Sequence, residues 1–187
     1  MITAIDQSSA LVVIDMQKGI VGAGTVHPAD VVLQNVVKLA EAFRAKKRPV
    51  VLVRVGWSAD GGDALKSRTE SPQPGVRSAD FMEYADALKA DPLRDILVQK
   101  RQWGAFYGTD LDLQLRRRGV TNLVFGGIST SIGVESSARD AFERGYNLTF
   151  VSDAMTDRNA DAHDRALRII FPRMGEVGTV ADVLARL

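Results

Sequence analysis

Apolar and polar positions along the chain alternate between two patterns. Short apolar runs, rich in β-branched residues, predict buried strands at 10–14, 50–55, 96–98, 122–125 and 148–151. Between them, apolar residues recur at helical spacing and predict helices at 28–46, 109–119, 131–144, 160–171 and 179–187. Strands that alternate with helices indicate an α/β fold, with a parallel sheet covered by helices on both faces.

Each predicted helix has one apolar face. For the helices at 131–144 and 160–171, the residues expected to face the core are Val134, Ala138, Ala141, Phe142, Ala162, Ala166, Ile169 and Ile170. Two further helices are preceded by a threonine that stands three residues before an aspartate, at Thr109-x-x-Asp112 and Thr179-x-x-Asp182. This spacing predicts an N-terminal cap on each of them.

The segment 56–79 interrupts this regularity, because it is rich in Gly, Ser, Asp and Pro and shows no sustained period. An irregular stretch of this length inside a compact domain usually forms a functional lid or an assembly loop. A tolerated surface insertion explains the composition equally well. The segment that follows, 81–90, predicts one short helix.

Length and charge limit the class of protein. The chain has 187 residues, and we expect it to form a single domain over 1–187. Its 24 basic and 23 acidic residues give a net charge of +1, which does not suit a nucleic-acid-binding protein. No apolar stretch reaches membrane length and no export signal is visible, so we expect no membrane partner and a cytoplasmic location.

The chain contains no cysteine, which excludes a disulfide, a thiolate nucleophile and a cysteine-ligated metal. The only histidines are His27 and His163, so a three-histidine zinc centre is impossible. His163 stands between Asp161 and Asp164, which predicts a solvated helix face. His27 precedes Pro28 and is a candidate for capping the first long helix.

In parallel α/β sheets, ligands bind outside the carboxyl ends of the strands. The segments expected at that edge of the sheet are Asp15, 54–57, 99–103, 126–131 and 152–153.

Two of these residues are candidates for acid–base chemistry. Asp15 follows a strongly apolar strand, where desolvation would raise the pKa of its carboxyl and a neighbouring cation would lower it. An aspartate that binds loop amides would fit the same position. Lys100 follows another strand and could hold Asp15 ionised and polarise a substrate, although a solvated surface charge is the commoner role of lysine.

The segment 126–133 runs from a strand end into a helix start. Its glycines allow the backbone to approach a ligand closely, and free amides at a helix start attract negative charge. A tight turn capped by Thr130 or Ser131 is the alternative. Neither GxGxxG nor GxxxxGKS spacing is present, so no dinucleotide or triphosphate site is predicted.

Several motifs occur in a fixed order: VVIDMQ (12–17), Lys100, AFYGTDL (105–111), GIST (127–130), VESSARDA (134–141), GY (145–146) and DA (153–154). Over essentially the whole chain, this set resembles the isochorismatase-like hydrolase family. The resemblance implies a three-layer α-β-α fold with a six-stranded parallel sheet, and a homo-oligomer such as a dimer or tetramer. It also implies that Asp15 is the catalytic aspartate, that Lys100 is the catalytic lysine, and that a cis peptide joins Ile128 and Ser129.

The chain departs from this family at the nucleophile. The family's cysteine falls at Gly133, and glycine cannot attack a carbonyl, so a covalent thioester is excluded. The nicotinamidases of the family bind a metal through an aspartate and histidines after the second strand, but 56–60 contains no histidine. We therefore expect no metal, no cofactor and no nicotinamidase activity. The hydroxyls of Ser129, Thr130 and Ser131 are weak nucleophiles without a base, and they are expected to form the turn and cap the helix.

Two functions remain open. In the first, the chain hydrolyses a small molecule without a covalent intermediate, at a vinyl ether or at a C–N or C–O bond. Asp15 would act as general acid or base, Lys100 as its electrostatic partner, and amides around Ser129 and Gly133 would bind a substrate oxygen. Gly133 would leave room for water where the sulfur usually sits. The expected substrate-binding residues are Ile128, Ser129, Trp103, Phe106, Trp57 and Arg54.

In the second function, the chain has kept the fold, has lost the chemistry, and acts as a small-molecule binding or assembly protein. A phospho-acceptor receiver domain is disfavoured, because Asp6 lies at the wrong end of the first strand to complete a magnesium site.

Overall fold

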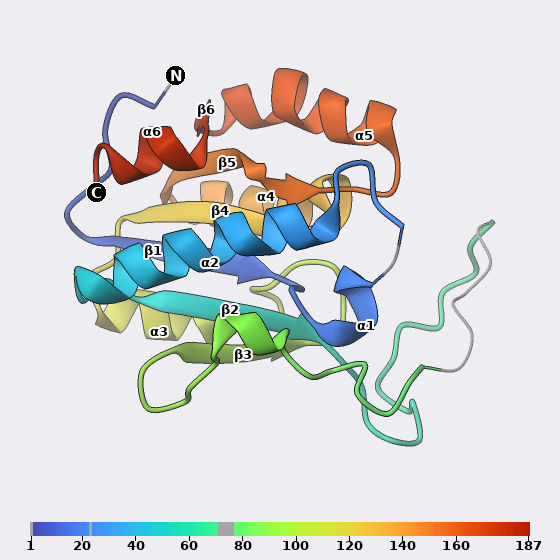
Figure 1. Cartoon of the computed structure of the whole chain (residues 1–187). Helices are drawn as coiled ribbons and strands as arrows, with labels where there is room; N and C mark the ends of the chain where they lie inside the picture. The colour runs from blue at the N-terminus through green and yellow to red at the C-terminus, as the bar shows by residue number, and fades with distance from the viewer. Residues whose placement is uncertain (1, 23, 71–76) are drawn as a thin grey trace.

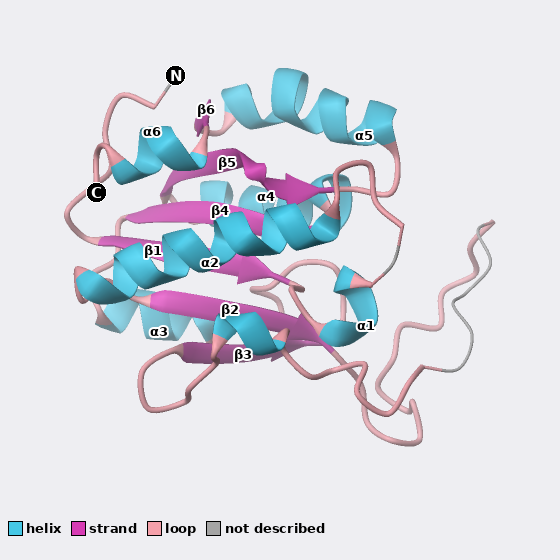
Figure 2. Cartoon of the chain, viewed as in Figure 1, coloured by secondary structure: helices cyan, strands magenta, loops and turns pink. Residues whose placement is uncertain are grey.

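The computed structural model describes residues 2–22, 24–70 and 77–187. Its six parallel strands form one sheet in the order β3-β2-β1-β4-β5-β6. The strands are β1 (Ser9–Ile14), β2 (Val50–Val55), β3 (Ile96–Lys100), β4 (Asn122–Ile128), β5 (Asn147–Thr156) and β6 (Glu176–Gly178). Helices cover both faces of the sheet (Figure 1, Figure 2), so the prediction of a three-layer α/β fold is confirmed.

Strand β1 lies in the middle of the sheet, and all six of its residues are buried. Because side chains alternate along a strand, Ala10, Val12 and Ile14 enter the core on one face of the sheet. Leu11 and Val13 enter the core on the other face. A strand that packs on both faces requires a continuous apolar run, which is the pattern at 10–14.

Helices α1 (Lys18–Val21), α2 (Ala29–Ala45) and α6 (Val180–Leu184) lie on one side of the sheet (Figure 1). The buried residues of α2 are the apolar positions of its sequence period: Val32, Val36, Leu39, Ala40 and Phe43. At α6 the predicted cap is confirmed, because Thr179 and Asp182 form a capping box.

Helices α3 (Leu111–Arg117) and α4 (Glu135–Glu143) cover the other side of the sheet. The predicted capping box at the start of α3 is wrong. The residue before α3 is Asp110, whose side chain makes no capping hydrogen bond. The Thr109 hydroxyl accepts a hydrogen bond from the Leu111 amide at 3.3 Å and donates one to the Ala105 carbonyl at 2.6 Å.

Two predicted helices contain π-helical turns. The turn η2 (Thr130–Val134) precedes α4, while η3 (Ala166–Ile170) and the 3₁₀ turn η4 (Phe171–Arg173) follow α5 (Ala160–Arg165). A π turn changes the phase of the residues that follow it relative to a 3.6-residue period. Ile169 is therefore 57% exposed, and Phe142, at the edge of the buried face of α4, is 48% exposed. The prediction that these two side chains face the core is wrong.

Strand β5 continues past its predicted end at Val151, because it contains an irregularity. Phe125 of β4 pairs with Phe150, whereas Gly127 pairs with Met155. The intervening β5 residues leave the regular register, and the Asp153 carboxylate accepts a hydrogen bond from the Val180 amide at 2.8 Å. Strand β6 has only three half-exposed residues, so the apolar pattern did not predict it.

The described parts of the segment 56–79 extend away from the sheet beyond the carboxyl end of β2 (Figure 1). The short helix expected in 81–90 is a single 3₁₀ turn, η1 (Asp86–Leu88). Within the described ranges, none of the helices combines the length and the apolar composition needed to cross a membrane.

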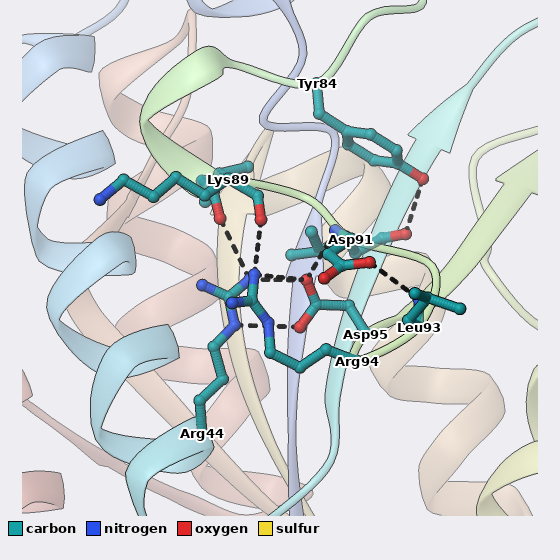
Figure 3. A network of polar contacts seen from close by, with 9 residues as sticks. Arg44, Tyr84, Lys89, Asp91, Leu93, Arg94 and Asp95 are labelled. Carbon is teal, nitrogen blue, oxygen red and sulfur yellow. Dashed lines mark hydrogen bonds and ion pairs between the residues drawn. The ribbon is translucent and has the colours of Figure 1, made fainter.

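At the amino end of the sheet, an ion pair ties α2 to the start of β3 (Figure 3). Arg44 donates to Asp95 through Nε and Nη2, at 2.9 and 2.8 Å. The Asp95 side chain is fully buried and also accepts a hydrogen bond from the Asp91 amide. Arg44 also donates to the Leu88 carbonyl. One guanidinium of α2 therefore binds both η1 and Asp95, the residue just before β3.

Replacing Asp95 with alanine is expected to lower the free energy of unfolding by about 3 kcal/mol, because it leaves the largely buried Arg44 charge without its partner. Urea denaturation followed by circular dichroism measures this change. Asp80→Ala removes an exposed carboxylate and should change the free energy of unfolding by less than about 0.5 kcal/mol. Equal stability of the two variants would contradict the role given to the ion pair.

Candidate functional site

Asp15 and Lys100 meet at the carboxyl edge of the sheet. Asp15 directly follows β1, and its amide donates to the Val53 carbonyl of β2 at 2.9 Å. Lys100 is the last residue of β3 and pairs in register with Val55 of β2. Asp15 and Lys100 therefore stand at the ends of β1 and β3, which lie on either side of β2.

The two side chains form a buried ion pair. Lys100 Nζ lies 2.7 Å from Asp15 Oδ2 and donates a second hydrogen bond to the Trp103 carbonyl at 2.8 Å. The side chains are only 2% and 8% exposed, for Lys100 and Asp15 respectively. Asp15 Oδ1 has no hydrogen-bond partner among the described residues. One carboxylate oxygen is thus held by the lysine, and the other is available to a proton or a ligand.

Burial raises the pKa of Asp15 to about 6, although the charge and hydrogen bond of Lys100 lower it. The desolvation effect is the larger one, because the carboxyl is removed from water on nearly all sides. A carboxyl with this pKa exchanges its proton close to neutral pH, which is the property that a general acid or base requires.

The turn after β4 lies against this pair. The Ile128–Ser129 peptide bond is cis, as the family resemblance implies. Gly127 has φ +120°, and a Cβ atom there would lie 2.1 Å from the Ile14 carbonyl oxygen. Only glycine allows β4 to approach β1 this closely, and this approach brings the turn over Asp15.

Gly133 faces the ion pair directly. A Cβ atom at this position would lie 3.3 Å from Asp15 Oδ2 and 3.5 Å from Lys100 Nζ. It would also lie 2.9 Å from the Ile14 Cγ2 methyl, which is closer than real Cβ contacts. The open space expected where a sulfur would sit is therefore narrower than predicted, because the Ile14 methyl occupies part of it.

The neighbouring hydroxyls bond to other elements and do not cap the helix. Thr130 Oγ1 lies 2.9 Å from Nδ1 of His163, and Ser131 donates to Asp157 through its hydroxyl at 2.8 Å and its amide at 2.7 Å. His163 is buried, so the predicted solvated position is wrong. Its ring packs edge-on against the ring of His27 with centroids 5.0 Å apart, and no side chain caps α2.

A cavity of about 300 Å³ opens over the ion pair. Its wall contains Asp15, Lys100 and Gly133, together with four of the expected substrate-binding residues: Trp57, Trp103, Ile128 and Ser129. Trp57 stacks on Phe81, with ring centroids 6.1 Å apart and an interplanar angle of 18°. Its Nε1 donates to the Arg101 carbonyl at 2.9 Å, which fixes the indole at the cavity wall.

The remaining two expected residues do not line the cavity. Arg54 donates to the Met82 carbonyl and to Gln99 Oε1, at 3.2 and 3.0 Å. Phe106 is buried in the core beside Tyr146, because the chain folds under α4 after β3. Arg54 and Phe106 therefore lie outside the wall of this cavity, and their role in substrate binding stays a prediction.

Five of the described cavity residues were not expected from the sequence: Ile20, Leu65, Arg77, Phe81 and Arg158. Arg77 lies in the irregular segment, where no period indicates which side chains face a site. Arg158 follows the actual end of β5 at Thr156. Because β5 was predicted to end at Val151, Arg158 was not expected at the carboxyl edge of the sheet. Phe81 is held by Gln17, whose buried amide nitrogen donates to the Phe81 carbonyl at 2.7 Å. Among the described residues, no group of three or more His, Asp or Glu side chains is arranged to hold a metal.

Comparison with protein families matches residues 9–182 to the isochorismatase domain. The chain belongs to the isochorismatase family. It is 49% identical over 183 residues to YecD of Escherichia coli O157:H7, an uncharacterized isochorismatase family protein, with 97% of each chain covered. It is 33% identical over 210 residues to the ureidoacrylate amidohydrolase RutB of Rhizobium rhizogenes, covering 98% of this chain and 85% of the relative.

A solved structure of an isochorismatase family protein from Burkholderia thailandensis has the same fold, with a TM-score of 0.94 and 47% sequence identity. The similarity covers 98% of this chain and 97% of that chain. The region matched to the family, residues 9–182, therefore includes all six strands and the residues that line the cavity.

Titration of Asp15 is expected to give a pKa of about 6, and Lys100→Met is expected to raise this pKa, because it removes the cation and hydrogen bond that favour the ionised form. Carbon-13 NMR of aspartate-labelled protein measures the value, and the resonance missing in Asp15→Asn identifies it. A pKa close to that of free aspartate, or a fall in Lys100→Met, would contradict the described balance of burial and charge.

Proposed function

We propose that this chain is a hydrolase of small molecules in which Asp15 and Lys100 act on a water molecule by acid–base catalysis, without a covalent enzyme intermediate. The observation that carries the proposal is the buried 2.7 Å ion pair at the cavity wall, with one carboxylate oxygen left free. The absence of cysteine and the glycine at 133 remove the thiol route and leave the acid–base pair.

In this mechanism the ionised Asp15 is the base. Asp15 Oδ1 takes a proton from water, the water oxygen bonds to the substrate carbonyl carbon, and the carbonyl electrons move onto its oxygen. Amides around Ser129 and Gly133 bind that oxygen. The proton then passes from Asp15 to the leaving nitrogen as the C–N bond breaks. Lys100 keeps Oδ2 fixed and favours the ionised carboxylate throughout.

A C–N bond is the favoured target because a relative with 33% identity is named an amidohydrolase. The same pair would serve cleavage of a vinyl ether with the proton moving in the opposite direction. There, protonated Asp15 donates to the alkene carbon, and water adds to the neighbouring carbon and gives a proton back to Asp15. That proton then passes to the leaving oxygen as the C–O bond breaks and the carbonyl forms. The two reactions differ in the protonation state that Asp15 needs, so they differ in pH dependence.

One observation favours the alternative, a binding or assembly protein without catalysis. The Ile14 methyl occupies part of the space at Gly133 where a nucleophile would stand. Attack must therefore come from water elsewhere in the cavity, and a protein that only binds its ligand needs no such water.

The test is turnover of a panel containing isochorismate, ureidoacrylate and neutral small amides, each incubated with the purified protein. Asp15→Asn is expected to lower kcat/KM by at least about 100-fold on the compound that is turned over. For a C–N substrate, kcat/KM of the unmodified protein should rise with pH through about 6, since the base is ionised above that value.

The matched control is Asp153→Asn, which removes an aspartate at the sheet edge that does not line the cavity. Its activity should stay within about threefold of the unmodified protein. Activity that survives Asp15→Asn unchanged would refute the role of Asp15. A rate that falls with rising pH would reject the base mechanism, and failure on the whole panel would favour the binding protein.

A further inference from the structure

A second groove, of about 630 Å³, lies at the amino end of the sheet. Its wall includes Pro49, directly before β2, and Ile96, the first residue of β3. The cavity over Asp15 and Lys100 lies at the other end of these strands, and the six residues of β2 separate the two sites by roughly 17 Å. The groove is therefore a site of its own.

Basic side chains dominate the wall of this groove. Asp95 is the only acid among the described lining residues, against five basic ones: Arg44, Lys47, Arg48, Arg94 and Arg118. The Asp95 side chain is fully buried and is shared by Arg44 and Arg94, at 2.8 and 3.4 Å (Figure 3). Lys47 and Arg118 have no ion-pair partner in the described part of the chain. In a chain with a net charge of only +1, positive charge is thus concentrated here.

Helices α2 and α3 both end at this groove, and the negative end of a helix is itself a reason for basic residues. The backbone, however, already satisfies part of both helix ends. In α2 the amides of Lys47 and Arg48 donate to carbonyls of the last turn, at 2.9 Å each. In α3 the amides of Gly119 and Val120 do the same, at 3.0 and 3.1 Å. The same termination motif therefore closes both helices without any cation.

The backbone conformation of Lys47 distinguishes the end of α2 from that of α3. The residue after the cap is left-handed in both, with φ +66° at Gly119 and φ +56° at Lys47. Glycine adopts this conformation without steric cost, whereas the Cβ atom of lysine is crowded there. Within the described ranges, the other non-glycine residues with positive φ are Lys89 and Asp15, and Asp15 stands in the candidate active site. Such conformations concentrate where a function needs the side chain, so Lys47 supplies the groove with a charge that the fold does not require.

The composition of the wall indicates which anion fits. No aromatic side chain is among its described residues, so a base or ring finds no stacking surface. Arginine donates two parallel hydrogen bonds to phosphate oxygens, and lysine binds them as a point charge. A single small anion would reach only part of a wall with five cations, whereas linked phosphates carry several charges along one chain.

We propose that this groove binds a chain of linked phosphate groups, with Lys47 and Arg118 as its unpaired cationic contacts. Inorganic polyphosphate and the triphosphate of a nucleotide share this chemistry. The site is independent of the reaction proposed at Asp15, because phosphate binding and turnover are measured separately and neither requires the other.

The experiment is isothermal titration calorimetry of the whole protein with tripolyphosphate, orthophosphate, ATP and hexaglutamate, in buffer without magnesium. Tripolyphosphate is expected to bind at least about tenfold more tightly than orthophosphate, because it reaches more cations, and its affinity should fall with added salt. ATP should bind within about threefold of tripolyphosphate, since the adenine has no aromatic partner.

Three results would overturn this ligand class. Equal binding of tripolyphosphate and orthophosphate would reject a chain of phosphates. ATP that binds more tightly than the threefold margin would indicate a nucleotide site instead. Hexaglutamate that binds as tightly as tripolyphosphate would indicate an acidic peptide as the partner.

Variants locate the site. Lys47→Gln and Arg118→Gln should each weaken tripolyphosphate binding at least about fivefold, since each removes one charged contact. Lys38→Gln and Arg68→Gln are the matched controls, because they remove an exposed lysine of α2 and an exposed arginine that do not line the groove. Each control should change binding by less than about twofold. Binding unchanged in both groove variants, or weakened as much by the controls, would overturn the assignment.

Lys47→Gly separates a ligand contact from a structural role. Glycine fits the left-handed conformation, so this variant should melt at least about 2 °C above Lys47→Gln, as measured by circular dichroism. It should nevertheless bind tripolyphosphate as weakly as Lys47→Gln. A Lys47→Gly variant that melts no higher than Lys47→Gln, or that binds like the unmodified protein, would overturn the role given to Lys47.

Discussion

The burial of a carboxyl beside an ammonium group governs the arrangement of the whole carboxyl edge of the sheet. A single charge in that environment would cost several kcal/mol, so Asp15 and Lys100 are tolerated only because they meet at 2.7 Å and the ammonium also bonds to a carbonyl. This requires β1 and β3 to end level with each other on either side of β2. It also requires Gly127, which lets β4 come close enough to β1 to cover the pair.

The central strands and the acid–amine pair were predictable from sequence because one rule governs both. Strands buried on both faces need uninterrupted apolar residues, so the first charged residue after each run marks the carboxyl edge of the sheet. Asp15 follows such a run in the central strand β1, whereas Lys100 follows a shorter apolar run in the edge strand β3, where Leu97 is 37% exposed. The prediction failed where local geometry departs from a simple period: in the irregularity of β5, in the π turns that displace Ile169, and in β6, whose three residues are too few to form a pattern.

Most other residues of the cavity wall were harder to predict from sequence than the Asp15–Lys100 pair. Trp57 was suggested by its place after β2, but Arg77 and Phe81 lie in a stretch where neither spacing nor alternation indicates orientation. Their positions depend on tertiary contacts, such as the hydrogen bonds from Gln17 to the Val55 and Phe81 carbonyls. Phe106 shows the converse case, because a residue near the site in sequence is used in the core.

The segment that carries Arg77 lies outside the hydrogen-bonded ladder of the sheet. Its side chains contribute to the rim of the cavity, whereas Asp15 follows the central strand β1 and Lys100 ends the edge strand β3. Part of the cavity wall and the acid–amine pair are thereby placed on separate parts of the polypeptide. Under the proposed function, exchange of residues on the projecting segment would change which molecules fit the cavity and would leave the sheet and the Asp15–Lys100 pair intact.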